Sequence, residues 1–328
     1  MKMGKGSSMN KNNCQLSTVN CQLINKSYGG VEALKNISFE VERGEIFGII
    51  GPDGAGKTTL FRILTTLILA DSGTATVDSR DVVKEYNEIR KHVGYMPGRF
   101  SLYQDLTVEE NLDVFAKVFN TTIEENYHLI KDIYVQIEPF KKRRAGKLSG
   151  GMKQKLALCC ALIHKPSVLF LDEPTTGVDP VSRKEFWEML KRLKNEGITI
   201  LVSTPYMDEA SLCDRIALIQ NGRFLKIDTP EAIVKQFDAD LWAMRSNNMS
   251  KLLTDLRQHP QVLSCFAFGD SHHVTLQKGN SDIDGLKSFL AQKGHTSVEI
   301  EKIEATVEDC FMELATSDSA DNKLNPMF

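Results

Sequence analysis

The chain has 328 residues, 41% of them hydrophobic and 25% charged, so it is long enough for one large globular domain and a smaller one. This composition excludes a disordered or fibrous protein. The formal net charge of −3 at pH 7 provides no overall attraction to nucleic acid or anionic lipid, and we expect no nucleic-acid partner.

Cysteine usage and apolar patterning favour a reduced, cytoplasmic compartment. The seven cysteines are odd in number and lack metal-ligand spacing. The first dozen residues are polar and basic, and the longest apolar-rich run, near 60–70, is interrupted by Arg62 and two threonines. We therefore expect neither a secretion signal nor a membrane-spanning helix.

The first two thirds of the chain predict an α/β domain. Residues 1–17 are polar and are expected to form a disordered tail. Over residues 18–236, short apolar strands alternate with amphipathic helices, which predicts a parallel sheet covered on both faces. Between about 98 and 147 the strands stop, and Thr107 and Glu110 stand at capping-box spacing before a helical pattern. We predict an inserted helical subdomain there.

The last third predicts a separate small domain. Residues 238–316 read as β-α-β-β-α-β, with a tight turn at Gly269-Asp270-Ser271 between the middle strands. That order predicts a ferredoxin-like α+β accessory domain. The remaining residues, 317–328, are polar and are expected to be disordered.

A phosphate-binding loop is predicted at "GPDGAGKTT", which follows the apolar strand "EIFGII" and opens a periodic helix. Its glycines let successive N–H groups meet phosphates at a helix N-terminus. Lys57 would bridge the β- and γ-phosphates, and the Thr58 hydroxyl would bind Mg²⁺. A glycine-rich turn with an incidental lysine is the alternative, disfavoured because pattern and context agree. The predicted ATP-contacting residues are Gly51, Asp53, Gly54, Ala55, Gly56, Lys57, Thr58 and Thr59.

Two acids follow the apolar strand in "VLFLDEP" and are placed at its carboxyl end, where open α/β sheets bind ligands. Asp172 would hold Mg²⁺, directly or through water, and Glu173 would act as the general base on the attacking water. Taken alone, this pattern is also that of an ordinary strand end. Downstream of a phosphate-binding loop it predicts a catalytic role for Glu173 together with Lys57.

A second anion site is predicted at "LSGGMKQ", where Ser149, Gly150 and Gly151 precede a helix. Two such sites in one chain make sense if the second serves the nucleotide of another subunit. A capped surface helix is the alternative.

These motifs and "TTGVDP", in this order over about residues 20–235, resemble the nucleotide-binding domain of ABC ATPases. The chain is also similar to the ATPase subunits of exporters of the drug and type-2 permease class, which often carry a small C-terminal αβ domain. The resemblance implies a head-to-tail dimer with two ATP molecules, each held between the phosphate loop of one chain and the "LSGG" of the other. It assigns Tyr28 to stacking on adenine and Asp179 to the loop that communicates across the dimer. Each assignment has an alternative, in which Tyr28 is a core aromatic residue or Asp179 is a helix N-cap.

The resemblance also implies partners and a location. The partners would be an integral-membrane permease and a second ABC ATPase, identical or different. The chain would be cytoplasmic and peripheral on the inner face of the plasma membrane. Apolar residues of the helical subdomain would either dock the permease or form subdomain core: Leu102, Tyr103, Leu106, Val114 and Phe115.

Two positions depart from the family pattern. Gly98, in "GYMPGRF", replaces a glutamine whose oxygen would touch Mg²⁺ and the attacking water. Pro205, in "LVSTPYMDEA", replaces a histidine that would bind the γ-phosphate, and proline offers neither a side-chain donor nor an N–H. We predict that ATP binding is kept while hydrolysis is slowed. Gln104 is a candidate stand-in for the glutamine, whereas His92 and His164 are expected at the surface.

The leading hypothesis is therefore an ATP-hydrolysing energy-coupling subunit of an ABC exporter. One alternative is a nucleotide-sensing ABC subunit with little turnover, which the two departures favour. Another is an ABC ATPase not tied to transport, but neither the long coiled coil nor the paired cassettes typical of nucleic-acid and ribosome types are present.

Overall fold

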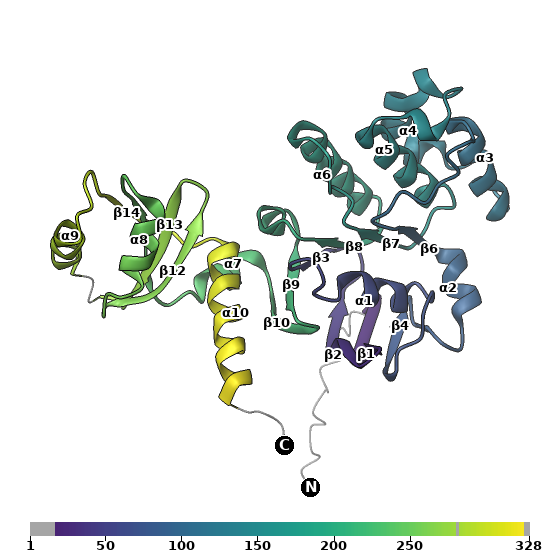
Figure 1. Ribbon diagram of the computed structural model, residues 1–328. Helices are drawn as coiled ribbons and strands as arrows, with labels where there is room; N and C mark the ends of the chain where they lie inside the picture. Colours follow the sequence, from purple (N-terminus) through teal and green to yellow (C-terminus); the bar gives the residue numbers. More distant parts are fainter. Residues whose placement is uncertain (1–16, 280–281, 325–328) are drawn as a thin grey trace, which may run out of the picture. The chain divides into compact units, whose positions relative to one another are not determined.

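The computed structural model describes residues 17–279 and 282–324 (Figure 1). The chain divides into two compact units: the first is the chain up to Ile46 with Thr58–Leu201, and the second is Phe47–Lys57 with the chain from Val202 on. The predicted tail over residues 1–16 lies outside the described part. Within the described ranges, no helix combines the length and apolarity needed to cross a bilayer.

The first unit opens with an antiparallel sheet of strand order β2-β1-β4-β5, which the sequence pattern did not anticipate. Its hairpin turns at Gly29-Gly30, where φ values of +53° and +88° favour glycine. The strands are β1 (Val19–Tyr28), β2 (Val31–Val41), β4 (Ser72–Val77) and β5 (Arg80–Asp81).

The predicted α/β sheet is present, with the strand order β10-β9-β3-β8-β7-β6. Strand β3 pairs in parallel with β9, and β6 with β7, whereas β10 is an antiparallel edge strand. Strands β3, β7 and β8 are buried along their whole length, as expected for a sheet covered on both faces. The strands are β3 (Ile46–Ile50), β6 (Val93–Met96), β7 (Val168–Asp172), β8 (Thr199–Thr204), β9 (Arg215–Gln220) and β10 (Arg223–Asp228).

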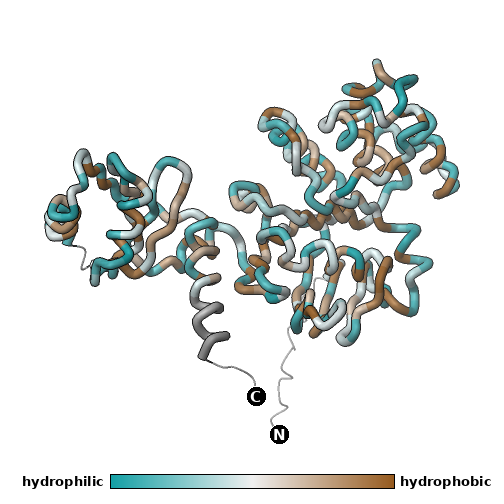
Figure 2. The backbone as a smooth tube through the Cα atoms, viewed as in Figure 1, coloured by the Kyte–Doolittle hydropathy of each residue, from teal (hydrophilic) through white to brown (hydrophobic). Residues whose placement is uncertain are grey.

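Helices replace strands over the predicted helical subdomain. Thr107 and Glu110 form the capping box, with Glu110 N donating to Thr107 Oγ1 at 3.2 Å and Thr107 N to Glu110 Oε2 at 2.8 Å. Buried Asn111 donates to the carbonyl oxygens of Tyr103 and Thr107, so the preceding loop is fixed to the helix. Figure 2 shows apolar and hydrophilic stretches alternating along these amphipathic helices. The helices of the first unit are α1 (Lys57–Leu64), which starts at the unit boundary, α2 (Tyr86–His92), α3 (Val108–Val118), α4 (Tyr127–Ile137), α5 (Gly150–Leu162) and α6 (Pro180–Asn195), with short 3-10 turns η1 (Glu138–Phe140) and η2 (Ala145–Lys147).

The second unit ends in the small domain expected from the sequence. Its elements follow the predicted β-α-β-β-α-β order, and its antiparallel sheet has the strand order β12-β13-β11-β14. Its assignment to the ferredoxin-like class stays a prediction. The elements after β8 are η3 (Met207–Leu212), a 3-10 helix, α7 (Pro230–Lys235), β11 (Asp240–Arg245), α8 (Met249–Leu256), β12 (Val262–Phe268), β13 (Ser271–Leu276), α9 (Ile283–Gln292), β14 (Glu299–Ile303) and α10 (Val307–Leu324).

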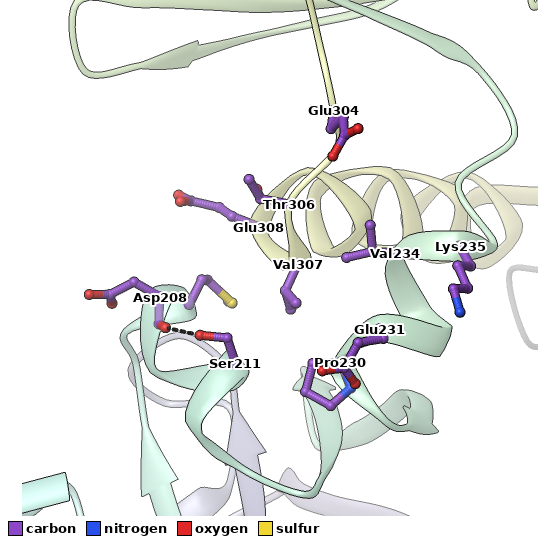
Figure 3. A pocket seen from close by; sticks show the side chains of 11 residues that line it. Asp208, Ser211, Pro230, Glu231, Val234, Lys235, Glu304, Thr306, Val307 and Glu308 are labelled. Atoms are coloured by element: carbon purple, nitrogen blue, oxygen red, sulfur yellow. Dashed lines mark hydrogen bonds between the residues drawn. The ribbon is translucent and has the colours of Figure 1, made fainter. Parts of the chain in front are cut away.

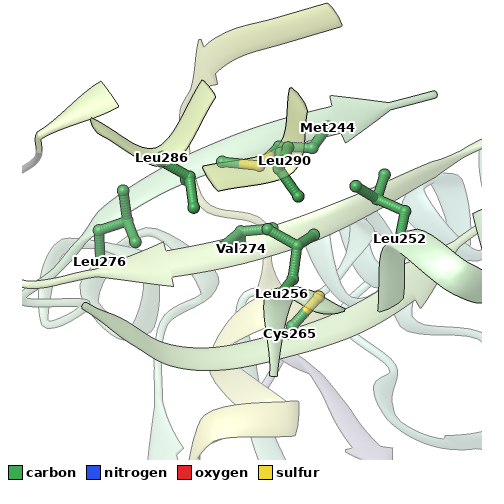
Figure 4. Packing of buried hydrophobic residues seen from close by; sticks show 8 residues of the cluster. All are labelled: Met244, Leu252, Leu256, Cys265, Val274, Leu276, Leu286 and Leu290. Carbon is green, nitrogen blue, oxygen red and sulfur yellow. The ribbon is translucent and has the colours of Figure 1, made fainter. Parts of the chain in front are cut away.

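The small domain has a hydrophobic core of its own between the sheet and helices α8 and α9 (Figure 4). Helix α10 follows and continues to Leu324, whereas the sequence predicts disorder from residue 317. That prediction differs from the structure over 317–324, and residues 325–328 lie outside the described part. The core cluster comprises Met244, Leu252, Leu256, Cys265, Val274, Leu276, Leu286 and Leu290.

Candidate functional site

The predicted phosphate loop folds around the ammonium group of Lys57. Gly54 and Gly56 have φ values of +78° and +107°, which L side chains rarely adopt, so the loop requires glycine there. The Lys57 side chain is 3% exposed and donates to the carbonyl oxygens of Gly51 at 2.8 Å and Pro52 at 2.9 Å. The loop therefore places the Lys57 ammonium group inside its bend, at the N-terminus of α1. Helix N-termini of this kind bind anions.

Gly51 is required for close packing. A Cβ atom at this position would lie 2.1 Å from the carbonyl oxygen of Ile219 in β9. Its N–H donates to the carbonyl of Thr204 at 3.2 Å. The start of the loop is therefore fixed to the end of β8, immediately before Pro205.

The acid pair stands at the carboxyl end of β7, as predicted. Asp172 is 2% exposed. Glu173 has a φ of +51°, a left-handed conformation that costs a non-glycine residue roughly 1–2 kcal/mol. A turn in which Thr176 N donates to the Glu173 carbonyl at 3.2 Å follows it. A strained backbone conformation persists only where the surrounding structure enforces it, and such conformations cluster at functional sites.

Tyr95 is a neighbour of Asp172 that the sequence motifs did not predict as part of the site. It lies in β6, paired beside Phe170 of β7. Burial raises the pKa of the Tyr95 phenol to about 12, and the negative charge of Asp172 raises it further, while Arg62 opposes the shift. Its place in "GYMP", directly after the strand glycine Gly94, was the available signal.

Gly98 lies against the acid pair. A Cβ at this position would be 3.0 Å from the Asp172 carbonyl oxygen and 3.8 Å from Glu173 Cβ. A side chain at position 98 would thus start beside Asp172 and Glu173. Gln104, the candidate stand-in, packs instead against Gly146, whose N–H donates to its carbonyl at 2.9 Å.

The "LSGG" and "TTGVDP" segments lie beside each other. Cβ atoms added to Gly150 and Gly151 would lie 3.7 Å from the Gly177 carbonyl oxygen and 3.5 Å from Ser182 Oγ. Ser149 caps α5 by accepting from Met152 N at 3.4 Å. Its cap is exposed at the surface, so a capping role and a role toward another subunit's nucleotide are compatible.

Asp179 is an N-cap, as one of its two interpretations required. Its carboxylate accepts from Ser182 N at 3.0 Å, followed by Pro180 at the first position of α6. The backbone and side-chain hydrogen bonds of Ser182 hold the Asp179 pKa below its usual value. The group is therefore anionic at neutral pH.

Tyr28 is not a core aromatic. Its side chain, at the end of β1, is 47% exposed, and Lys26 Nζ lies 5.6 Å from its ring centroid. The interpretation as a buried packing residue is wrong, and an exposed ring remains available for stacking on a planar group.

Pro205 follows β8 in a tightly bonded loop. The hydroxyl of Thr204, which is fully buried, donates to Glu209 Oε2 at 2.6 Å and accepts from Tyr206 N at 3.1 Å. Neither neighbour of Pro205 in the chain is histidine. Pro205 thus lies between Thr204, which contacts the phosphate loop, and the start of η3.

The two histidines expected at the surface differ. His92 forms a local hydrogen bond to Glu88 on an exposed helix. His164 stacks on Phe119, with ring centroids 3.8 Å apart, and its Nε2 lies 3.0 Å from the Val93 carbonyl oxygen. Burial lowers the pKa of His164 to about 4, so the expectation of a surface residue is wrong.

The residues present fit a magnesium ion bound together with a nucleotide. A threonine hydroxyl and a carboxylate are the hard oxygen donors that Mg²⁺ prefers. In the described part of the chain, no group of three or more His, Cys, Asp or Glu side chains could hold a metal by itself. Thr58 and Asp172 would therefore share the ion with water and phosphate oxygens.

A glycine-rich loop opening a helix, an acid pair after a buried strand and a serine-glycine helix start, set on this α/β fold, define an ABC-type ATPase cassette. The "ABC transporter" family model matches residues 34–176. The Nod factor export ATP-binding protein I of Burkholderia lata is 33% identical over 309 residues, covering 91% of this chain and 97% of that protein. The chain belongs to the family of ABC transporter ATP-binding proteins.

Two further likenesses agree. The probable multidrug ABC transporter ATP-binding protein YbhF of Escherichia coli K12 is 38% identical over 297 residues, covering 89% of this chain but 51% of that protein. The chain thus spans about half the length of the first curated relatives it matches. The dimeric ATP-binding cassette MJ0796, in a post-hydrolysis state with ADP and Pi, has 26% identity and a TM-score of 0.59 over 64% of this chain and 98% of that one.

Proposed function

We propose that this chain is the ATP-binding and ATP-hydrolysing subunit of an ABC exporter, and that hydrolysis at its own phosphate loop is slow. The relatives named for multidrug transport and Nod factor export support the exporter class. The dimeric structure of the similar cassette MJ0796 supports a dimer, and the head-to-tail arrangement is the one that places each "LSGG" on the nucleotide of the other subunit. The permease partner, a second ABC ATPase and a peripheral position on the inner face of the plasma membrane follow from the same class.

In this proposal each motif acts on one part of the nucleotide. Lys57 binds the β- and γ-phosphates, and the loop N–H groups orient them. Mg²⁺, held by Thr58 and Asp172, would neutralise charge that develops on the phosphates. Glu173 orients and deprotonates the attacking water. Tyr28 stacks on adenine, while Ser149, Gly150, Gly151 and Asp179 act on the nucleotide of the partner subunit.

Two positions support slow hydrolysis. A side chain at position 98 would start at the Asp172–Glu173 segment, yet position 98 is glycine. Position 205 directly follows Thr204, whose carbonyl oxygen accepts a hydrogen bond from Gly51 N at the start of the phosphate loop. Position 205 is nevertheless a proline. Two contacts to the metal, water and γ-phosphate are therefore missing beside an otherwise complete set. Losing one positioned transition-state donor typically costs about 10²–10³ in rate.

Nucleotide binding and steady-state ATPase activity of the full chain test the core of this proposal. Lys57→Ala should weaken binding of a fluorescent ATP analogue, whereas Glu173→Gln should retain binding and abolish the residual phosphate release. Glu188→Gln, on α6, is a matched control because its acid lies outside every motif. Residual turnover that survives Glu173→Gln would show that this site is not the source of activity.

The same departures favour one second function, a nucleotide-sensing subunit with little turnover. Purifying the chain with a membrane permease and measuring single-site turnover separates the two. The exposed Tyr103, 58% accessible on the loop fixed by Asn111, is the proposed permease contact, whereas Leu102 is buried and belongs to the subdomain core. Tyr103→Ala should reduce co-purification of the permease, and unchanged recovery would exclude this residue from the contact.

A further inference from the structure

The second unit contains a cavity of about 670 Å³ that none of the nucleotide motifs uses (Figure 3). It lies between η3, α7 and the segment that joins β14 to α10. Ligand pockets typically enclose about 300–1,000 Å³ and are mainly apolar. The walls here include Met207, Pro230, Val234 and Val307, and Figure 3 shows Val234 and Val307 directed into the space.

The rim of this cavity is strongly acidic. Four exposed acids from three segments line it, Asp208, Glu231, Glu304 and Glu308, against a single cation, Lys235. Partial burial raises the pKa of Glu308, and the charges of Asp309 and Asp208 raise it further, while His273 opposes the shift. Negative charge is thus concentrated around an apolar floor, which is complementary to a cation with an apolar body.

One wall of the cavity is connected to the loop that contains Pro205. Met207, Asp208 and Ser211 belong to η3. In the same 3-10 helix, buried Glu209 accepts the hydrogen bond from Thr204, whose carbonyl accepts the first N–H of the phosphate loop. A ligand that moves η3 therefore acts on the residue directly before Pro205.

The opposite wall is connected to the small C-terminal domain. Thr306 and Asp309 form the cap of α10, with Thr306 N donating to Asp309 Oδ2 at 2.8 Å. The other carboxylate oxygen of Asp309 lies 2.6 Å from Nδ1 of His273 in β13. The cavity is thus enclosed by a wall that is fixed to the accessory sheet.

We propose that this cavity binds a small amphipathic organic cation, with its apolar body against Val234 and Val307 and its charge at the acidic rim. Binding there changes nucleotide affinity through η3 and Thr204. The binding site is independent of the proposed function, whereas its coupling to nucleotide rests on it.

Two fluorescent probes with the same xanthene frame test the binding. Rhodamine 6G is an apolar cation and fluorescein is an anion, so fluorescence anisotropy with the full chain should show saturable binding of the first and not of the second. The double variant Glu304→Gln with Glu308→Gln should weaken rhodamine binding roughly three- to tenfold, because two charge contacts at the exposed rim are lost. Glu301→Gln, an exposed acid of β14 outside the cavity, is the matched control and should leave the affinity unchanged.

A filled cavity gives a second readout. Val234→Trp occupies the space without altering charge and should abolish rhodamine binding while the circular-dichroism spectrum stays native. Equal binding of both probes, or undiminished binding by Val234→Trp or by the double Gln variant, would overturn the site.

Nucleotide coupling is measured separately. Saturating Mg-ADP should change the rhodamine 6G affinity at least twofold in the wild type, and this change should vanish in Thr204→Val, which removes the hydroxyl bonded to Glu209. Rhodamine affinity that does not respond to bound ADP would overturn the coupling and leave the site. Failure of a fluorescent ADP analogue to bind at all would instead count against the proposed function.

Discussion

Gly98→Gln restores the amide that the family pattern places beside the proposed magnesium ligand, Asp172, and the proposed base, Glu173. The added Cβ would meet the Asp172 carbonyl oxygen at 3.0 Å, so the neighbour must give by a few tenths of an ångström. Position 98 has no left-handed φ, so the side chain introduces no backbone strain. We expect a stability cost of about 1 kcal/mol from this crowding. We also expect roughly a tenfold rise in kcat, less than the full contribution of a positioned donor.

Gly98→Ala separates crowding from chemistry, because it adds the same Cβ without an amide. Phosphate release at saturating Mg-ATP gives kcat, and thermal unfolding gives the stability cost of each variant. Both variants should lose similar stability, and only Gly98→Gln should gain rate. Equal kcat values for the two variants, at equal melting temperatures, would refute the assignment of position 98 to the catalytic centre.

Three further outcomes follow from the geometry. Gly51→Ala should destabilise the protein by roughly 1–3 kcal/mol and weaken nucleotide binding, since its Cβ would lie 2.1 Å from the Ile219 carbonyl oxygen; urea unfolding that matches the wild type would contradict this. The His164 pKa is lowered to about 4, so between pH 6.5 and 4 the unfolded chain binds a proton that the folded chain does not, and the free energy of unfolding falls by roughly 3 kcal/mol over that range. His164→Phe should flatten this pH dependence, and an unchanged slope would exclude His164 as its source. Tyr28→Ala should weaken ATP binding roughly tenfold while Tyr28→Phe keeps it, as expected for stacking; equal affinities for both variants would argue against contact with adenine.

The sequence predicted those features that depend on local pattern. The phosphate loop, the capping box at Thr107 and the β-α-β-β-α-β order each follow from residues close together in the chain. The left-handed Glu173 and the neighbourhood of Tyr95 and Asp172 depend on a turn and on strand pairing that no local motif reports.

The incorrect expectations share the same cause. His164 looked like a surface residue because its position at a helix end is visible in the sequence, while the Phe119 ring that covers it is distant in the chain. The contact of Gly51 with phosphate stays a prediction, whereas its close approach to β9 depends on the sheet and is not reported by the motif. Polar composition suggested disorder after 316, but α10 continues to Leu324.

The central claim is that this chain binds ATP well and hydrolyses it slowly because position 205 lacks a donor. Single-turnover hydrolysis and equilibrium ATP binding of the wild type, Pro205→His and Pro205→Ala test it most directly. We expect one common affinity and at least a tenfold faster turnover in Pro205→His alone, since both variants restore the backbone N–H but only histidine supplies a side-chain N–H toward the γ-phosphate. A Pro205→His rate equal to that of Pro205→Ala, at unchanged ATP affinity, would contradict it.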